Sequence, residues 1–495
     1  MKSLRNNTRR FNRQGKGTGS AVSLSSVGLL CMILMPWLVY QKGAGVGWIA
    51  IGCFGATLLL WQLCSYRLLR FSIQQNRITL PGYFGKRFGE KSPALRIIFA
   101  VVLAAFLLLS ATMILYILTS FSKQLFGSRV YLTAIGVALI STGFYFLTGR
   151  GGLRRVERWF AALVLFSLLA MNVSIFRVLG TRGILENIFH SWAAGSVSEF
   201  VNVTYMGGES LSIVEIISLF ALGFLVLGNP ISLQRFQQTD RARTIHRSRR
   251  WAVIFCLLAL FLATLTGGML RASLYPARIT SVQELFRWIL EEDQGRGFLF
   301  HLTGVIFVVS AGLLILSQFH ACILQATHII HENIYPYLGK KNKKNRPGHE
   351  WAFAAILILS EIVVVSNSVG CGDWIYRVTG LTFLVLASGL APVLVLSLHS
   401  ERMTGTGCLA GFLGGALTAA VWTFGNWIPS GAERLTMFEL TNLTAVVPAM
   451  AMGVLMVILG SKLSKAPSEQ LVREFEEVKF RLVTSDGNEK KDKNE

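Results

Sequence analysis

The apolar stretch FLFHLTGVIFVVSAGLLILSQFHACILQATHII, residues 298–330, decides the fold class of this chain. It contains no Asp, Glu, Lys or Arg, and a helix of this length rises about 50 Å, which exceeds the ~30 Å hydrocarbon core of a bilayer. Polar side chains at membrane depth usually face other helices or a water-filled path. The group Ser317-Gln318-Phe319-His320 in its middle therefore predicts a membrane helix with a binding role near its centre.

The composition extends this prediction to the whole chain. Of the 495 residues, 52% are hydrophobic and 15% are charged, whereas soluble domains carry about 25% charged residues. The repeated apolar runs predict an all-α polytopic membrane protein with about 12 transmembrane helices. The predicted spans are 21–40, 46–65, 97–121, 130–148, 159–176, 211–231, 251–270, 298–330, 351–369, 378–398, 405–425 and 442–461.

The formal net charge of +22 is explained by membrane topology. With the N-terminus in the cytoplasm, 37 of the 48 Lys and Arg residues fall in inner segments and 11 in outer ones. This asymmetry follows the positive-inside rule, so the charge requires no nucleic-acid partner. We expect both termini in the cytoplasm of a plasma or inner-membrane protein: a basic tail at 1–20, a transporter domain at 21–464 and a charged tail at 465–495.

Two predicted spans are interrupted by residues that break helices. The first contains Gly28 and Pro36, and the sixth contains Gly223 and then Gly228-Asn229-Pro230. Proline removes a backbone donor, and broken membrane helices often mark a transport site. The two spans are equivalent if the chain holds two five-helix repeats, and the alternative at each position is a simple kink or helix end.

Several segments resemble the sodium:solute symporter family, and within it the sodium/proline symporters most closely. The segments on which this resemblance rests are, in chain order, WIAIG with ITLPGYFGKRFGEKSPALRII, GNPISLQRFQQTDRARTIHRSRR, HENIY, GLAPVLVLSLHSERMTGTGCLAGFLGGALTAAVW and LGSKLSKAPSE. The resemblance covers about residues 20–475. It implies a LeuT-type 5+5 inverted repeat, with repeats at about 21–176 and 211–398 and two further helices at about 405–461.

The resemblance also implies a cation site, with sodium as the coupling ion. Its backbone carbonyl positions fall on Leu24, Val27 and Leu314, and its hydroxyl pair falls on Ser317 and Gln318. Ser317 keeps the hydroxyl, whereas Gln318 replaces a Ser or Thr. A glutamine carbonyl can bind a hard cation, so we expect an altered sodium site.

The implied substrate positions depart further from the family. They fall on Ser26 in place of an acidic residue, Gly28 in place of a serine, and Leu222 and Val226 in place of aromatic residues. The family's WTD motif is represented by Arg158-Trp159-Phe160. Members also usually begin with an extra helix and a GGR loop, whereas this chain starts at the first core helix.

Three interpretations of the function follow. The leading one is a secondary active transporter that takes up a small organic solute, such as a proline-like amino acid, by cation-coupled alternating access. The second couples uptake to protons through Glu215 or His320, since ionisable groups within membrane spans can relay protons; Glu361 in the ninth span is a further acidic candidate. The third is a transporter-like sensor without coupled transport.

Other classes find no support in the sequence. The seven cysteines form no CxxC pair, so neither a metal cluster nor a disulfide framework is predicted. The sequence holds no nucleophile–base arrangement, and we expect neither an enzyme nor a resident cofactor. The oligomeric state is not encoded in any pattern that we recognise.

Overall fold

The fold was analysed in a computed structural model of the chain. The structure describes residues 19, 22–74, 79–89, 93–127, 130–191, 197–237, 245–277, 279–291, 297–338, 347–367, 372–425, 428–430 and 433–476. The predicted tails at 1–20 and 465–495 therefore lie largely outside the described residues.

Ten stretches of helix in the described part are long and apolar enough to cross a membrane. They coincide with ten of the twelve predicted spans, and their bounds are Val22–Lys42, Ala44–Gln74, Ala94–Lys123, Glu157–His190, Ile213–Gln237, Ile245–Ser273, Phe298–Tyr337, Arg377–His399, Gly405–Phe424 and Val446–Leu463. The all-helical membrane prediction is confirmed.

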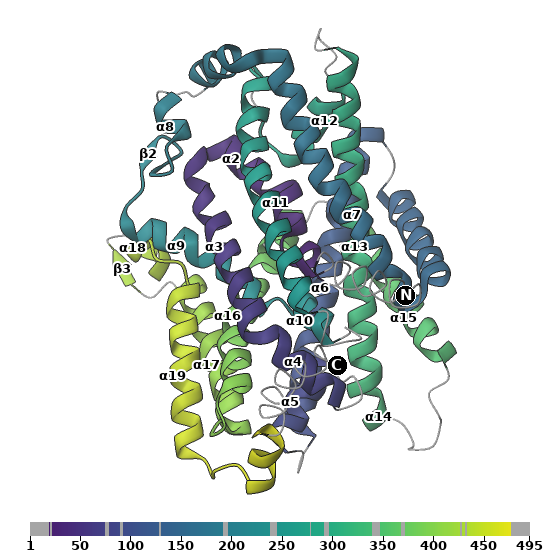
Figure 1. The fold of residues 1–495 in the computed structure, drawn as a ribbon, viewed down its shortest axis with the longest axis vertical. Coiled ribbons are helices and arrows are strands. Elements are labelled where there is room, and N and C mark those ends of the chain that lie inside the picture. Colours follow the sequence, from purple (N-terminus) through teal and green to yellow (C-terminus); the bar gives the residue numbers. More distant parts are fainter. Residues whose placement is uncertain are drawn as a thin grey trace, which may run out of the picture.

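The elements follow one another along the chain as shown in Figure 1. The first helix, Val22–Lys42, contains η1 (Leu30–Leu34) and α2 (Met35–Lys42). There follow η2 (Ala44–Val46), α3 (Gly47–Leu59), η3 (Leu60–Cys64), α4 (Ser65–Gln74), α5 (Leu80–Arg87), α6 (Ala94–Phe126), α7 (Val130–Ser191), α8 (Val197–Val201), α9 (Ile213–Gly223), η4 (Phe224–Gly228), α10 (Pro230–Gln237) and α11 (Ile245–Ser273). The later helices are α12 (Val282–Glu291), α13 (Phe298–Asn333), α14 (Tyr335–Leu338), α15 (Pro347–Asn367), α16 (Gly372–His399), α17 (Gly405–Phe424), α18 (Met437–Thr441) and α19 (Val446–Leu463). Two short antiparallel pairs, β1 (Tyr205–Met206) with β2 (Glu209–Ser210) and β3 (Ile428–Ser430) with β4 (Glu433–Leu435), lie in loops.

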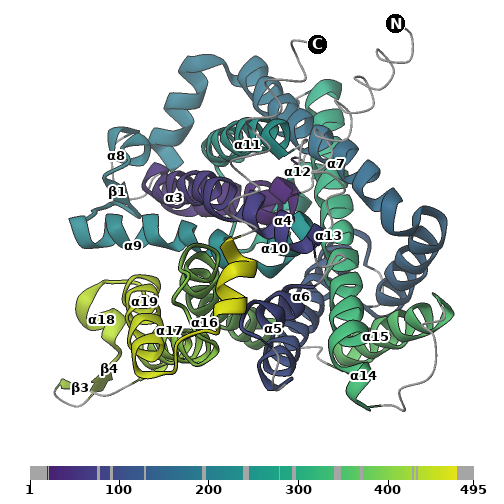
Figure 2. The ribbon, with the colours of Figure 1, turned by 60° about the horizontal axis from the view of Figure 1, so that its bottom comes forward.

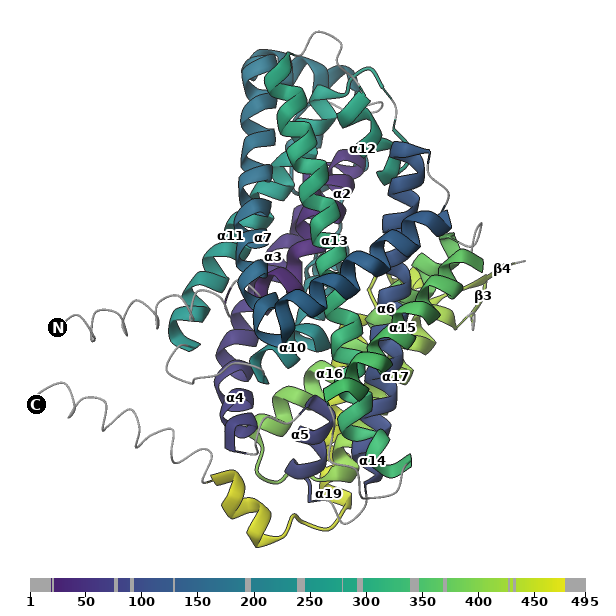
Figure 3. The same cartoon turned by 90° about the vertical axis from the view of Figure 1, so that its right-hand side faces the viewer.

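The other two predicted spans, 130–148 and 351–369, lie in helices whose side chains are only partly described. The segment 130–148 is the start of α7, a single helix of 62 residues, and Figure 3 shows that α7 changes direction along its length. The inner loop expected between the fourth and fifth spans is therefore helical. The segment 351–369 largely coincides with α15.

The first helix and α3 form the centre of the bundle. Figure 2 shows them surrounded by α9, α11, α13 and α16, while α17 and α19 lie together at the edge. Val22, Val27, Cys31, Met32 and Met35 of the first helix are fully buried. Most side chains of this helix are apolar and at least partly buried, although Leu34 is 47% exposed.

Both predicted helix breaks correspond to irregular backbone. The sixth span changes from α9 to the 3₁₀ segment η4, reaches extended backbone at Asn229, and resumes as α10 at Pro230. The first helix does not unwind; it widens into the π-helical turn η1 directly after Gly28. Single π-turns inside α-helices often occur at functional sites.

Glycines let the backbones of the second and sixth spans cross at very short range. A Cβ added to Gly52 of α3 would lie 2.0 Å from the carbonyl oxygen of Phe220, and one added to Gly223 of α9 would lie 2.2 Å from the backbone nitrogen of Cys53. Backbone atoms cannot move aside as side-chain ends can. The absence of Cβ atoms at these positions thus fixes the position of α9 just before its break.

Several loops that the sequence places on opposite sides of the membrane lie toward opposite ends of the molecule. Segments expected on the cytoplasmic side, including α5, α14 and the helical residues 469–476, lie at one end, and α8 and α12 lie toward the other (Figures 1 and 3). The end that holds α5 is packed, because Arg87 of α5 donates to the Ser397 and Ser400 carbonyls at the end of α16 and stacks on Phe475.

We predict that Gly52→Ala destabilises the protein by roughly 1–3 kcal/mol, the usual range for overpacking. Gly55→Ala on the same helix is the matched control, because its added Cβ would meet only the Phe220 ring, at 4.0 Å. Both changes gain similar helix propensity. Thermal unfolding of the purified protein in detergent measures the difference, and equal melting temperatures for the two variants would contradict the backbone crossing.

Candidate functional site

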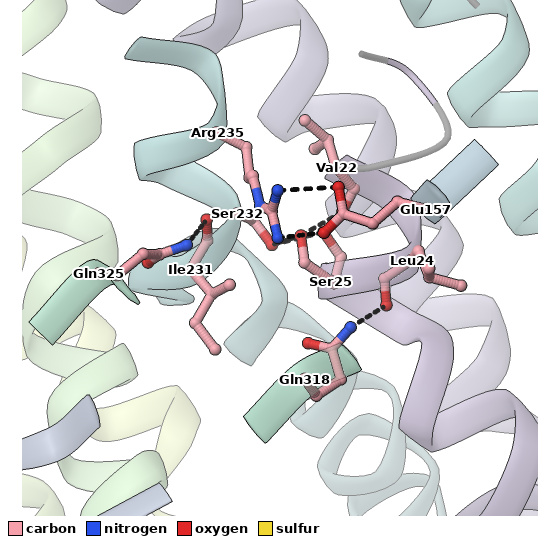
Figure 4. Close-up of polar contacts among 10 residues, drawn as sticks. Val22, Leu24, Ser25, Glu157, Ile231, Ser232, Arg235, Gln318 and Gln325 are labelled. Atoms are coloured by element: carbon pink, nitrogen blue, oxygen red, sulfur yellow. Dashed lines mark hydrogen bonds and ion pairs between the residues drawn. The ribbon is translucent and has the colours of Figure 1, made fainter. Parts of the chain in front are cut away.

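The middle of α13 contacts the first helix through Gln318. The Gln318 side-chain amide donates from Nε2 to the carbonyl oxygen of Leu24 at 3.4 Å, and both residues are buried (Figure 4). The structure therefore joins two of the predicted cation-site residues directly. The amide nitrogen is hydrogen-bonded to the Leu24 carbonyl, which the family resemblance assigns to the cation.

The Ser317 hydroxyl next to it is buried and unsatisfied. Ser317 is 4% exposed, and its Oγ has no hydrogen-bond partner among the described residues. A buried serine in a helix commonly donates to the carbonyl four residues earlier, as Ser310 does to Ile306 at 2.6 Å. An unsatisfied buried hydroxyl costs about 1–3 kcal/mol, and Gln325 Oε1 on the same helix is a second buried oxygen without a partner among the described residues.

The remaining predicted cation-site residues are apolar and buried. Leu314 and Val27 are fully buried. A Cβ at Gly28 would lie 3.2 Å from Leu314 Cδ1 and 3.4 Å from Leu24 Cδ1. Gly28 therefore allows the close approach of α13 to the first helix just before the π-turn.

Polar side chains tie the break in the sixth span to the first helix. Ser232 Oγ lies 2.7 Å from Ser26 Oγ and 3.4 Å from Ser25 Oγ, and Asn229 Nδ2 donates to the Ser25 carbonyl. Asn229 Oδ1 also accepts from the backbone N–H of Ile231. The predicted substrate residue Ser26 is thus already hydrogen-bonded to α10.

A buried ion pair anchors α10 on its other side. Arg235 donates to both carboxylate oxygens of Glu157 in α7, through Nη1 at 2.8 Å and through Nη2. The side chains are only 4% and 1% exposed. A bidentate pair fixes geometry as well as charge, so α7 and the first helix together hold the segment that follows the break (Figure 4).

The other predicted substrate residues lie in apolar packing. Leu222 contacts a small cluster made of Ala221, Leu225, Ala387 and Val446. Val226 belongs to the main core. The structure places Leu222 toward α16 and α19 rather than beside Ser26 and Gly28.

The two proton-coupling candidates have different surroundings. Glu215 is the third residue of α9 and completes a capping box, in which its Oε2 accepts from the Ser212 backbone N–H at 2.8 Å while the Ser212 hydroxyl accepts from the Glu215 N–H. This arrangement satisfies helix-end donors and gives Glu215 a structural task. His320 is buried in α13, near enough to Arg235 for the guanidinium to act on it electrostatically.

The sequence interpretation missed the residues that hold the break. Glu157, Ser232, Arg235 and Gln325 were not singled out, although Gln325 Nε2 donates to the Ile231 carbonyl at 3.3 Å. One signal was present: Glu157 and Arg235 lie at the edges of apolar spans, and buried opposite charges tend to pair. No sequence pattern indicated which charges would meet.

We predict that Glu157→Gln destabilises the protein by about 3–5 kcal/mol, because it removes the carboxylate that pairs with the buried Arg235 cation. The double variant Glu157→Leu with Arg235→Met removes both charges, and it should recover most of that loss. Thermal unfolding of the single and double variants forms the comparison. A double variant that is less stable than Glu157→Gln would show that the loss of the Glu157–Arg235 ion pair does not cause the destabilisation.

The comparisons with known sequences agree with the resemblance. Residues 15–415 match the model of the sodium:solute symporter family. The chain is 26% identical to the sodium/proline symporter of Escherichia coli K12 over 475 residues, covering 94% of this chain and 89% of the relative. It is also 26% identical to the high-affinity proline transporter PutP of Bacillus subtilis 168, covering 93% and 94%.

Solved structures agree on the fold. A Na⁺-coupled sialic acid symporter in a substrate-bound outward-open state superposes with a TM-score of 0.70 at 14% identity, covering 93% of each chain. The nucleobase-cation-symport-1 family transporter Mhp1, in a closed conformation, gives a TM-score of 0.52 at 11% identity, covering 94% of this chain and 96% of that one. The chain thus has the LeuT-type transporter fold. With the family pattern matching most of its length, it belongs to the sodium:solute symporter family.

Proposed function

We propose that this multi-pass membrane protein imports a small amino acid or a zwitterion of similar size, driven by a sodium ion bound between the first helix and α13. Sodium-coupled solute uptake is the function that its family membership assigns. The solute class, the ion ligands and the orientation in the membrane are the parts that we add.

One observation supports the position of the ion. The Ser317 hydroxyl is buried without a partner on α13, one residue from the amide that contacts Leu24 on the first helix. We propose the carbonyls of Leu24, Val27 and Leu314, the Ser317 hydroxyl and the Gln318 side chain as ligands. Oxygen donors of this kind coordinate sodium at irregular helices in related folds.

Gln318 has two roles in this proposal. In the structure its amide nitrogen donates to the Leu24 carbonyl and so joins the two helices directly. Rotation of the amide by half a turn would present Oε1 instead, and a cation between the two oxygens would then join the same helices. Since the hydrogen bond from the Gln318 amide to the Leu24 carbonyl must break before the ion binds, we expect weaker sodium binding than a second hydroxyl would allow.

The proposed solute class is supported by the relatives, which are named as proline transporters. Ser26 and Gly28 on the first helix and Val226 at the break of the sixth span are the proposed substrate positions, whereas Leu222 is left out because it lies toward α16 and α19. They lack the acidic and aromatic side chains that the resemblance implies at these positions. We therefore propose that the preferred solute differs from proline while sharing its charge pattern.

We propose that both termini lie in the cytoplasm. The support is the charge asymmetry of the loops, together with the separation of α5 and α14 from α8 and α12 toward opposite ends of the molecule.

A second function is favoured by the Gln318 amide itself. Because the amide already joins α13 to the first helix without an ion, the protein could bind solute and change conformation without coupled transport, as a sensor does.

The experiment that separates these functions is uptake of labelled amino acids and organic acids into proteoliposomes, with and without an inward sodium gradient. We predict accumulation of at least one solute with the gradient and little without it. Solute binding with no uptake of any solute under either condition would favour the sensor. Uptake that follows a proton gradient but ignores sodium would favour proton coupling.

We predict that Ser317→Ala raises the sodium concentration for half-maximal uptake roughly tenfold, which corresponds to about 1.4 kcal/mol. The matched control is Ser310→Ala on the same helix, because its hydroxyl is satisfied by the Ile306 carbonyl. Gln318→Thr should shift the sodium dependence in the opposite direction, since it removes the competing amide. An unchanged sodium dependence in Ser317→Ala would remove this serine from the ion site.

A further inference from the structure

Glu361 is a carboxylic acid buried at membrane depth in α15. The residues Ile356, Leu359 and Val363 of the same helix are 59%, 61% and 59% exposed and form its outward face, whereas Glu361 is 4% exposed. It points toward α6, where it contacts Thr112. Ionisable groups in such positions are rare and usually functional, yet neither the fold nor the proposed cation site requires this one.

Its hydrogen bonds leave room for one more proton. Thr112 Oγ1 lies 2.5 Å from Glu361 Oε2 and 3.1 Å from the carbonyl oxygen of Leu108. A threonine hydroxyl carries a single proton. If the carboxylate is ionised, that proton can serve only one of the two acceptors, and the other stays unsatisfied.

Protonation of Glu361 resolves this conflict. The carboxylic acid then donates to Thr112 Oγ1, and the threonine donates to the Leu108 carbonyl, so that each donor has one acceptor. An unsatisfied buried acceptor costs about 1–3 kcal/mol, and an ionised carboxylate in an apolar interior costs more. The geometry of the three oxygen atoms therefore fits a neutral Glu361.

Among the residues whose side chains the structure describes, no charged group stabilises an ionised form of Glu361. The helices α6, α7 and α13 pack against α15. Among the residues whose side chains the structure describes, the titratable group near Glu361 is the buried thiol of Cys322 on α13. No cationic partner of Glu361 occurs among these residues.

We propose that Glu361 and Thr112 form a proton-binding site inside the membrane, distinct from the position at Ser317 and Gln318, which ties the packing of α15 against α6 to pH. One proton from water binds Glu361 in the conformation described. Loss of that proton leaves an anion between α6 and α15 and loosens the contact. The proposal does not depend on the identity of the solute or of the coupling ion.

Infrared spectroscopy of the purified protein tests the site directly. We expect a carbonyl stretch of a protonated carboxylic acid at neutral pH that is absent in Glu361→Gln. The band should shift in Thr112→Val, which removes the hydroxyl, and shift much less in Thr112→Ser, which keeps it. Glu215→Gln, which changes a carboxylate of a helix cap, should leave the band in place. A spectrum without a band that depends on Glu361 would overturn the proposal.

Thermal unfolding against pH tests the consequence. In the wild type the folded chain keeps a proton that the unfolded chain releases, so its melting temperature should fall as pH rises above the range in which exposed glutamates ionise, about 4.3. The side chain introduced by Glu361→Gln is uncharged at every pH, so the melting temperature of this variant should fall less. The same fall in both proteins would overturn the link to pH. If Glu361→Gln fails to fold, the Thr112→Val and Thr112→Ser pair supports the same comparison.

Discussion

In a lipid bilayer, a backbone N–H or C=O group that loses its helical hydrogen bond finds no water to replace the partner. The arrangement of the site depends on how this chain satisfies such groups around the break from Phe224 to Asn229. Side chains take over the hydrogen bonds there. Asn229 binds both the Ile231 N–H and the Ser25 carbonyl, and Gln325 donates to the Ile231 carbonyl. Each of these bonds also joins the broken span to itself, to the first helix or to α13, so the groups that satisfy the break are the ones that position the site.

The same constraint explains why α13 packs through apolar side chains in some turns and through polar side chains in others. Its outer turns pack on apolar residues, while its centre presents Gln318 to the Leu24 carbonyl and leaves the Ser317 hydroxyl unsatisfied. The ion pair of Arg235 with Glu157 holds α10 from the opposite side. Among the described residues, α13 contacts the first helix through the neutral hydrogen bond of Gln318, whereas movement of α10 against α7 would separate two buried charges. We infer that the contact through Gln318 is the weaker of the two and the one that an ion can replace.

A second polar contact, between Glu361 of α15 and Thr112 of α6, lies away from the central site. It involves a helix with an exposed apolar face, formed by Ile356, Leu359 and Val363, whereas the first helix is mostly buried. Ion binding at the centre would act on the contact of α13 with the first helix. Proton binding at Glu361 would act on the contact of α15 with α6.

The sequence by itself determined the class, the spans and the location of the breaks, because length and apolarity alone decide which segments can enter a bilayer and because proline and glycine act locally. Gly228-Asn229-Pro230 predicted the irregular backbone correctly, whereas Gly28 and Pro36 produced a π-turn instead of an unwound segment. The junction between the fourth and fifth spans was predicted as a loop, yet it is helical in α7, since basic residues alone do not end a helix. Only the tertiary structure decided that Glu157 meets Arg235, that Gln318 meets Leu24 and that Glu361 meets Thr112. These pairs are 78, 294 and 249 residues apart, and a buried polar group chooses its partner from whatever packing brings within hydrogen-bond distance.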